Sequence, residues 1–258
     1  MDCNFGISGK KYLVTGASSG IGQAAVILIS KCGGRVVLNG RNKERLQQTH
    51  DQIAGEGHII MPYDLTDLEG MKQYVKDCID TDGRRFDGMV FSTGIGGGIP
   101  IRTEKLDNLK NMMEVSFYPY FVLLKEFSSR RVLNDNGSIV AVSSSCVVWP
   151  GKSQMSYASS KAALDLSSQI AAKEFLSRKI RVNTVRPIAL RSMMTEIYFS
   201  QASAEEIQKN YPLGVLEAGD VANSIVFLLS DMSSKITGQH IFLTAGGDGS
   251  PMDFFHLS

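Results

Sequence analysis

Cysteine is scarce in this chain of 258 residues, and its four cysteines are scattered without a CxxC pair. That spacing is not typical of a disulfide framework or a zinc site, and it indicates reduced thiols in the cytosol. The net charge is only +1 and no basic run occurs, so the chain lacks the field that attracts nucleic acid or an anionic membrane. No apolar stretch reaches membrane-spanning length, and no apolar signal segment follows Met1. We therefore expect a cytoplasmic protein without a membrane or nucleic-acid partner.

Histidine is equally sparse, with four residues that stand apart from one another and from any group of carboxylates. A bound metal ion needs several such ligands close together. We therefore expect no metal site and no chemistry based on histidine.

Short apolar runs alternate with longer amphipathic stretches along the whole chain. The runs are nearly continuous in Val, Ile and Leu, as in strands buried on both faces of a parallel sheet. Expected strands cover Lys11–Val14, Arg35–Leu38, His58–Met61, Gly88–Phe91, Ser138–Val142, Arg181–Val185 and His240–Leu243. Expected helices cover Gly20–Cys32, Lys43–Ala54, Leu68–Asp80, Leu106–Arg130, Ser156–Lys179 and Asp220–Ser230. This alternation predicts one doubly wound Rossmann-type α/β domain over residues 1–258, with a seven-stranded parallel sheet and helices on both faces.

The least regular part of the chain is 188–214, and a loop of that length in a compact domain is usually functional. We expect it to be the substrate loop. It contains the apolar residues Met193, Met194, Ile197, Tyr198 and Phe199. These residues fit either a lid over an apolar substrate or one face of a short core helix, and both interpretations stay open.

The first expected strand ends in Thr15-Gly-Ala-Ser-Ser-Gly-Ile-Gly22 and leads directly into a helix. Glycines permit a tight turn and a close backbone approach to a pyrophosphate, and the N-terminus of the helix offers unpaired N–H groups. The turn predicts a dinucleotide site. Its expected binding residues are Gly16, Ser18, Ser19, Gly20, Ile21 and Gly22.

The residues after the second expected strand indicate which dinucleotide binds. NAD-binding folds often place an acidic side chain about 20 residues downstream, on the ribose hydroxyls. This chain has Asn39-Gly40-Arg41 there, without an acid. Arg41 can pair with a 2′-phosphate and Asn39 can donate a hydrogen bond nearby, so NADP(H) is the expected cofactor. A solvated loop residue is the alternative interpretation of Arg41.

Tyr157 and Lys161 are spaced i and i+4, which places them on one face of a helix. A tyrosine near its reference pKa of about 10 is a poor base at neutral pH, and a cation one turn away favours its phenolate. The preceding strand delivers Ser144, 13 residues before Tyr157. This set predicts acid–base chemistry at an oxygen atom. Cys146 and Trp149 follow Ser144, and either line the substrate pocket or simply pack in a loop.

On these motifs the chain resembles the short-chain dehydrogenase/reductase family, in its compact branch, over nearly its whole length. The motifs are Thr15–Gly22, Asp64-Leu65-Thr66, Ser144, Tyr157-x-x-x-Lys161, Arg181–Pro187 and Ile236–Gln239. The resemblance implies that Ser144 polarises a carbonyl, that Tyr157 exchanges the proton, and that Lys161 binds the nicotinamide ribose and lowers the pKa of Tyr157. It also implies that Asp64 and Leu65 flank the adenine, that Arg41 contacts the 2′-phosphate, and that Asn183 is structural.

Four positions depart from the family pattern. Phe91-Ser-Thr-Gly94 replaces Asn-Asn-Ala-Gly, so Gly94 alone keeps the backbone contacts to the cofactor. Ser116 matches an asparagine that holds a water in the family's proton relay, so either reprotonation of Tyr157 is slower here or a different water path has taken over. Pro187-Ile188 replaces Pro-Gly beside the nicotinamide, and Ala245-Gly-Gly247 replaces Asp-Gly-Gly.

The expected function is NADPH-dependent reduction of a carbonyl to a secondary alcohol, most similar to that of 3-oxoacyl-carrier-protein reductases. The substrate is then a small-molecule or acyl-thioester carbonyl compound. Two alternatives stay open: a dehydrogenase of a sugar, steroid or other secondary alcohol, and a non-catalytic dinucleotide-binding protein. Family members usually form dimers or tetramers, and we expect a homodimer or homotetramer in which the aromatic tail at Phe254 and Phe255 docks on a neighbour.

Overall fold

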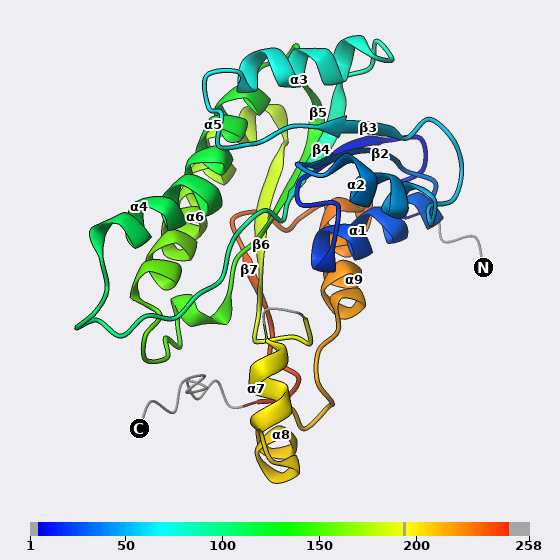
Figure 1. Ribbon diagram of the computed structural model, residues 1–258. Coiled ribbons are helices and arrows are strands. Elements are labelled where there is room, and N and C mark those ends of the chain that lie inside the picture. Colours follow the sequence, from blue (N-terminus) through cyan, green and yellow to red (C-terminus); the bar gives the residue numbers. More distant parts are fainter. Residues whose placement is uncertain (1–4, 193–194, 248–258) are drawn as a thin grey trace.

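Figure 1 shows a computed structural model of the chain, which describes residues 5–192 and 195–247. Seven strands, all paired in parallel, form one sheet in the order β3-β2-β1-β4-β5-β6-β7. The strands are β1 (Lys11–Val14), β2 (Arg35–Gly40), β3 (Ile59–Pro62), β4 (Phe86–Phe91), β5 (Leu133–Val142), β6 (Arg181–Pro187) and β7 (His240–Leu243). The expected doubly wound sheet is confirmed.

The winding of the chain reverses between β1 and β4. β1 pairs with β2 on one side and with β4 on the other, so that Leu13 lies opposite both Val37 and Met89. In open α/β sheets the loops diverge at such a point and leave a crevice beyond the carboxyl ends of the strands. The sheet therefore places the ends of β1, β4 and β5 around one site.

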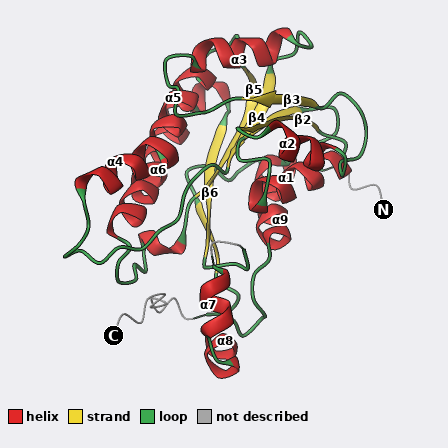
Figure 2. Cartoon of the chain, viewed as in Figure 1, coloured by secondary structure: helices red, strands yellow, loops and turns green. Residues whose placement is uncertain are grey.

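Helices cover both faces of the sheet (Figure 2). α1 (Gly20–Lys31), α2 (Lys43–His50) and α9 (Ala218–Leu229) lie on one face, and α3 (Met71–Asp80), α4 (Leu106–Ser116), α5 (Tyr118–Phe127) and α6 (Met155–Glu174) lie on the other. Alternate side chains of β1 serve the two layers: Tyr12 and Val14 join the core under α1 and α9, and Leu13 joins the core under α5 and α6. Both cores are apolar, which explains the nearly continuous hydrophobic runs.

The single helix expected over Leu106–Arg130 is wrong, because the structure has two helices there. α4 ends at Ser116, Phe117 leaves the helical conformation at φ −126°, and α5 begins at Tyr118. Pro119 lies in the first turn of α5, where its missing N–H is not needed. In an uninterrupted helix its ring would meet the carbonyl group of Val115. The break places Ser116 at the carboxyl end of α4, close to the ends of β4 and β5.

Other helix ends differ from expectation by a few residues. α6 ends at Glu174 instead of Lys179, because a short 3₁₀ turn over Leu176–Arg178 follows and Lys179 takes a left-handed conformation with φ 54°. α2 also ends early, at His50. Among the described residues, no helix is both long and apolar enough to cross a membrane.

The region 188–214 contains two short helices, α7 (Glu196–Gln201) and α8 (Ala204–Asn210). Phe199 is buried there in a small separate core, 5.7 Å from the ring centre of Tyr211. Of the two open interpretations, Phe199 thus fits a core helix. Met193, Met194, the side chains of Ile197 and Tyr198, and the aromatic tail at Phe254 and Phe255 lie outside the described residues.

Candidate active site

The glycine-rich turn after β1 is packed as a pyrophosphate cradle requires. Gly16 has φ +65°, and a Cβ atom on it would lie 3.0 Å from the carbonyl oxygen of Ser92. A Cβ atom on Gly22 would lie only 2.3 Å from the carbonyl oxygen of Gly16. Any side chain at either position would push the turn apart. Gly20 differs, because it has φ +55° but faces open space, with no described atom within 4 Å of its Cβ position.

The N-terminus of α1 points its free donors at that open space. Ser19 is the N-cap residue, yet its side chain caps none of the N–H groups of the first turn. Those groups have no partner inside a helix and carry the positive end of the helix dipole. The turn therefore fits a dinucleotide phosphate, which would be held by the backbone of Ser19, Gly20, Ile21 and Gly22.

Thr15 joins this turn to the next loop of the site. Its fully buried Oγ1 accepts hydrogen bonds from the N–H groups of Ser92 (3.0 Å) and Thr93 (3.2 Å), directly after β4. The sequence analysis included Thr15 only as the start of the motif. In the structure it fixes the distance between the phosphate turn and the loop that carries Gly94.

Asn39 does not lie where the sequence suggested. It is 1% exposed, its Nδ2 donates to the carbonyl oxygen of Tyr63 at 3.2 Å, and its own carbonyl oxygen accepts from the N–H of Ala17. An inward-facing amide cannot donate to a phosphate outside the sheet. Asn39 thus shapes the turn through Ala17.

The other residues assigned to the adenine end lie close together beyond β2 and β3. Arg41 and Asp64 are exposed, whereas Leu65 is buried in the core under α5 and α6. Hydrogen bonds from Thr66 lower the pKa of Asp64, and the nearby Arg41 guanidinium acts in the same direction. Ser18 lies at the inner side of this end, with its Oγ 3.5 Å from the Cβ position of Gly40.

Ser144, Tyr157 and Lys161 meet where β5 ends and α6 begins. Lys161 is 5% exposed and donates to the carbonyl oxygen of Val142 at 2.9 Å, and its Nζ lies 5.9 Å from the centre of the Tyr157 ring. Ser144 lies close enough to Tyr157 to lower the pKa of its phenol, and its Oγ accepts from the N–H of Cys146 at 3.3 Å. The structure therefore brings the three side chains together as the spacing predicts.

Burial controls the protonation of this group. Desolvation raises the pKa of Tyr157 well above its ordinary value of 10, and the Cys146 thiol adds to this, while the hydrogen bond with Ser144 opposes it. Desolvation lowers the pKa of Lys161 to about 8, against the opposing effects of Cys146 and Asp165. Tyr157 is consequently a neutral phenol at neutral pH, and Lys161 still carries most of its charge.

A buried ion pair lies one helical turn beyond Lys161. Asp165 accepts from Nε of Arg186 at 2.8 Å, and both residues are less than a tenth exposed. Its second oxygen, Oδ1, lies 3.7 Å from Nδ1 of His240. The pair joins α6 to β6, so it fixes the helix that carries Tyr157 and Lys161 against the sheet.

Ser116 lies at the site, and its hydroxyl already forms two hydrogen bonds within the protein. It is fully buried, accepts from the N–H of Ile95 at 3.3 Å and donates to the sulfur of Met112 at 3.7 Å. A Cβ atom on Gly94 would lie 3.5 Å from Ser116 Oγ and 3.2 Å from Lys161 Nζ. Ser116 and Lys161 thus flank Gly94, as expected of residues at one site. Pro187 ends β6 and is buried beside Leu243 of β7.

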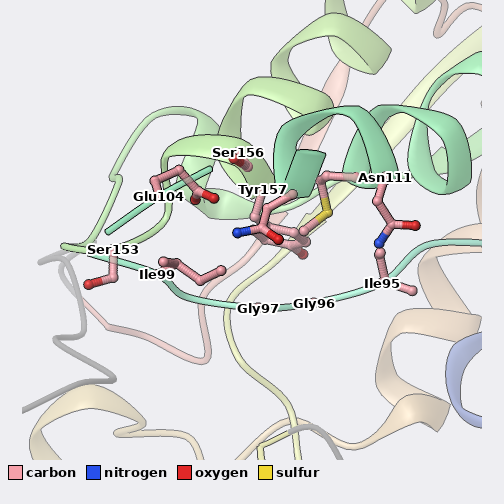
Figure 3. Close-up of a pocket in the computed structure, with 11 residues that line it drawn as sticks. Ile95, Gly96, Gly97, Ile99, Glu104, Asn111, Ser153, Ser156 and Tyr157 are labelled. Atoms are coloured by element: carbon pink, nitrogen blue, oxygen red, sulfur yellow. The ribbon is translucent and has the colours of Figure 1, made fainter. Parts of the chain in front are cut away.

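A cavity of about 150 Å³ opens beside Tyr157 (Figure 3). One wall is the loop after β4 with the start of α4, and the other is the start of α6. The lining residues are Ile95, Gly96, Gly97, Ile99, Glu104, Asn108, Asn111, Met112, Ser153, Ser156 and Tyr157. Trp149 packs instead on Phe242, at 4.8 Å between ring centres, and Cys146 is buried behind Tyr157.

The polar lining of this cavity is not apparent from the sequence. Asn108 and Asn111 are three residues apart, which places them on one side of α4, and Glu104 lies in the loop just before this helix. That spacing was visible in the sequence, but nothing in it indicated that this side faces Tyr157. No group of three His, Cys, Asp or Glu side chains in the described ranges is placed to hold a metal ion.

This fold and site define a class of protein. Residues 16–247 match a family model described as Enoyl-(Acyl carrier protein) reductase, and the chain belongs to the short-chain dehydrogenase/reductase family, an oxidoreductase family that acts on carbonyl and alcohol groups with a nicotinamide dinucleotide. It is 30% identical to the 3-oxoacyl-[acyl-carrier-protein] reductase FabG of Rickettsia conorii, over 93% of this chain and 97% of that protein. It is also 33% identical to carbonyl reductase family member 4 of Danio rerio, over 91% of this chain and 96% of that protein. A solved short-chain type dehydrogenase/reductase from Mycobacterium ulcerans superimposes with a TM-score of 0.81, at 27% identity, over 93% of this chain and 90% of the other.

Proposed function

We propose that this protein reduces a ketone to a secondary alcohol with NADPH. The observation that carries the proposal is the grouping of Ser144 and Tyr157 at the edge of a cavity, with the buried Lys161 ammonium beside them. Two hydroxyl donors that converge on one point suit an oxygen atom that gains negative charge during the reaction.

The protonation state of Tyr157 identifies this side chain as the proton donor. When bound, the dinucleotide supplies a hydride to the carbonyl carbon. Tyr157, a neutral phenol here, donates its proton to the carbonyl oxygen, while Ser144 donates a hydrogen bond to the same oxygen. The buried Lys161 ammonium stabilises the tyrosinate that remains, and proton transfer from solvent restores the phenol.

The raised pKa of Tyr157 suits proton donation to a carbonyl oxygen. Oxidation of an alcohol needs a tyrosinate as the base, and burial raises the pKa of Tyr157 away from that form. Reduction needs the phenol that this protein holds. A non-catalytic binding role is not favoured, because the three side chains are assembled and not dispersed.

NADPH is favoured over NADH by the exposed end of β2. Arg41 stands there without an acidic residue in the Asn39-Gly-Arg41 segment, and it helps to lower the pKa of Asp64, which follows β3. A free guanidinium pairs well with a phosphate. Gly16, Gly94 and Pro187 complete the proposed dinucleotide site through backbone contacts.

A second copy of the chain is the partner we propose. Large apolar side chains are exposed on the outer side of α5 and α6, among them Phe121 (57%), Leu166 (60%) and Ile170 (49%). Large apolar side chains exposed on two neighbouring helices suit an interface. Light scattering of the parent and of Phe121→Asp tests this: a smaller particle is expected for the variant. We also propose a cytosolic location, which the buried free thiols of Cys78 and Cys146 support.

The test of the function is NADPH oxidation with a panel of ketones, in the parent and in Tyr157→Phe. The variant keeps the ring but lacks the proton, so turnover should fall by about 100-fold or more while NADPH binding persists. Tyr12→Phe is the matched control, because the buried Tyr12 hydroxyl has no hydrogen-bond partner in the described structure. Near-parental turnover in Tyr157→Phe would refute the assignment.

A further inference from the structure

The cavity beside Tyr157 has a more specific chemistry than the proposed function requires. At the start of α4 it presents one carboxylate and two amides, from Glu104, Asn108 and Asn111. In Figure 3 the Glu104 carboxylate is directed inward, towards Ser156 and Tyr157. No Lys, Arg or His is present among the described residues that line the cavity.

The Glu104 carboxylate can accept further hydrogen bonds. Its Oε1 accepts from the N–H of Lys105 at 3.2 Å, and Glu104 forms no ion pair within the described ranges of the chain. An ionised carboxylate has about four acceptor positions and no donor. A ligand in the cavity therefore meets a strong acceptor that lacks a protein cation.

Ser156 supplies a second, independent sign that a ligand completes this wall. It is 4% exposed, it lines the cavity directly before Tyr157, and its Oγ has no hydrogen-bond partner among the described residues. A buried hydroxyl without a partner is costly to a fold. A ligand that carries its own hydroxyl would remove that cost.

The loop that forms part of this wall is held in a strained backbone conformation. Ser153, a residue with a side chain, has φ 65°, and its carbonyl oxygen accepts from the N–H of Ile99 at 2.8 Å. This bond joins the loop before α6 to the loop before α4. Left-handed conformations of ordinary residues persist where the surroundings enforce them, and they concentrate at functional sites.

We propose that the substrate is a hydroxyketone, in which a hydroxyl group next to the carbonyl donates a hydrogen bond to Glu104. This rests on the proposed reduction at Tyr157 and names its substrate class. A plain alkyl chain beside the carbonyl would bury Glu104 and Ser156 without partners, and sites built from polar groups reject such analogues strongly. Neutral hydroxyl groups suit the surrounding amides and the Ser156 hydroxyl better than a second charge does.

Three probes of equal size separate the possibilities: hydroxyacetone, aminoacetone and 2-butanone, which carry –OH, –NH₃⁺ and –CH₃ at the same position. For the parent we expect kcat/KM for hydroxyacetone to exceed that for 2-butanone by about 10- to 100-fold, the value of one hydrogen bond to a charged group. In Glu104→Leu that ratio should collapse towards one, chiefly through KM. Glu114→Leu changes an exposed glutamate of α4 that lies outside the cavity, so this variant is the matched control and should keep the parental ratio.

Any other outcome would contradict the proposal of a hydroxyketone substrate. A higher kcat/KM for aminoacetone would show that Glu104 selects an ammonium group, and a higher one for 2-butanone or acetoacetyl-coenzyme A would show that the cavity selects an acyl chain. Equal ratios in Glu104→Leu and Glu114→Leu would show that Glu104 does not contact the substrate.

Binding is measured separately by saturation-transfer NMR on the NADP⁺-loaded protein, with the same three ketones. Preferential binding of hydroxyacetone that Glu104→Leu loses, without any reduction, would uphold the cavity's selectivity and overturn the proposed reaction. Reduction of ketones without any preference for hydroxyacetone in either assay would support the proposed reaction and contradict the selectivity for hydroxyketones.

Discussion

Gly94 and Lys161 meet so closely that a Cβ atom on Gly94 would lie 3.2 Å from the Lys161 ammonium nitrogen. That nitrogen is already fixed by its bond of 2.9 Å to the carbonyl oxygen of Val142. Gly94→Ala should therefore displace the ammonium and lower kcat/KM by roughly 10- to 100-fold, with little change in melting temperature. Gly219→Ala is the control, since its Cβ position has no atom within 4 Å. Parental kinetics in Gly94→Ala would mean that the ammonium tolerates displacement.

The charge on Lys161 should leave a signature in the pH dependence of stability. Its pKa in the folded chain is about 8, below the ordinary 10.5, so the folded state loses its proton first as pH rises. The cost of burying the ammonium is complete below about pH 8 and is relieved between about pH 8 and 10.5. Relative to Lys161→Met, the parent should therefore gain up to about 3 kcal/mol in free energy of unfolding over this range, because one pKa unit corresponds to about 1.4 kcal/mol. Urea denaturation near pH 7 and pH 10 measures it, and a pH-independent difference would contradict it.

Arg41→Ala should alter the choice of cofactor. A charge-assisted contact to a 2′-phosphate is worth about 1.5–3 kcal/mol, or a factor of roughly 10 to 150. We expect NADPH to bind more weakly by that factor and NADH to bind as before. Fluorescence titration with both cofactors decides this, since equal losses would make Arg41 a structural residue.

Ser116→Asn tests the proton relay. The Ser116 hydroxyl is fully buried and its oxygen accepts from the N–H of Ile95, so the larger amide must displace the loop after β4. We therefore expect a lower kcat with an unchanged solvent deuterium isotope effect. A higher kcat with a smaller isotope effect would instead show that the absence of the family's asparagine slows reprotonation of Tyr157.

The sheet could be predicted because strands buried on both faces must be apolar nearly throughout, and turns interrupt such runs at regular intervals. The grouping of Ser144, Tyr157 and Lys161 could be predicted because Tyr157 and Lys161 are neighbours on one helix, and a strand end brings Ser144 to them. These features depend on local spacing or on the ends of parallel strands, which the sequence displays directly.

The remaining features depend on packing between distant segments. Glu104 and Asn108 lie about 50 residues before Tyr157, and the docking of α4 on α6 decides whether they face Tyr157. The inward orientation of Asn39 depends on the register of β2, because a shift of one residue along the strand moves each side chain to the other face of the sheet. The helix break at Phe117 could have been predicted from Pro119, since proline belongs in the first turn of a helix.

The small core formed by Ile188, Phe199, Tyr211, Leu216 and Ala245 is separate from the two large ones. A segment opens at a free-energy cost set by the contacts it breaks, and five side chains hold far less than the cores on either side of the sheet. The region around α7 and α8 is thus its own cooperative unit, whose amide hydrogens should exchange with solvent faster than those of β1, β4 and β5. This unit can open and close without loosening β1 and β5, the strands that lead into the glycine-rich turn and to Ser144.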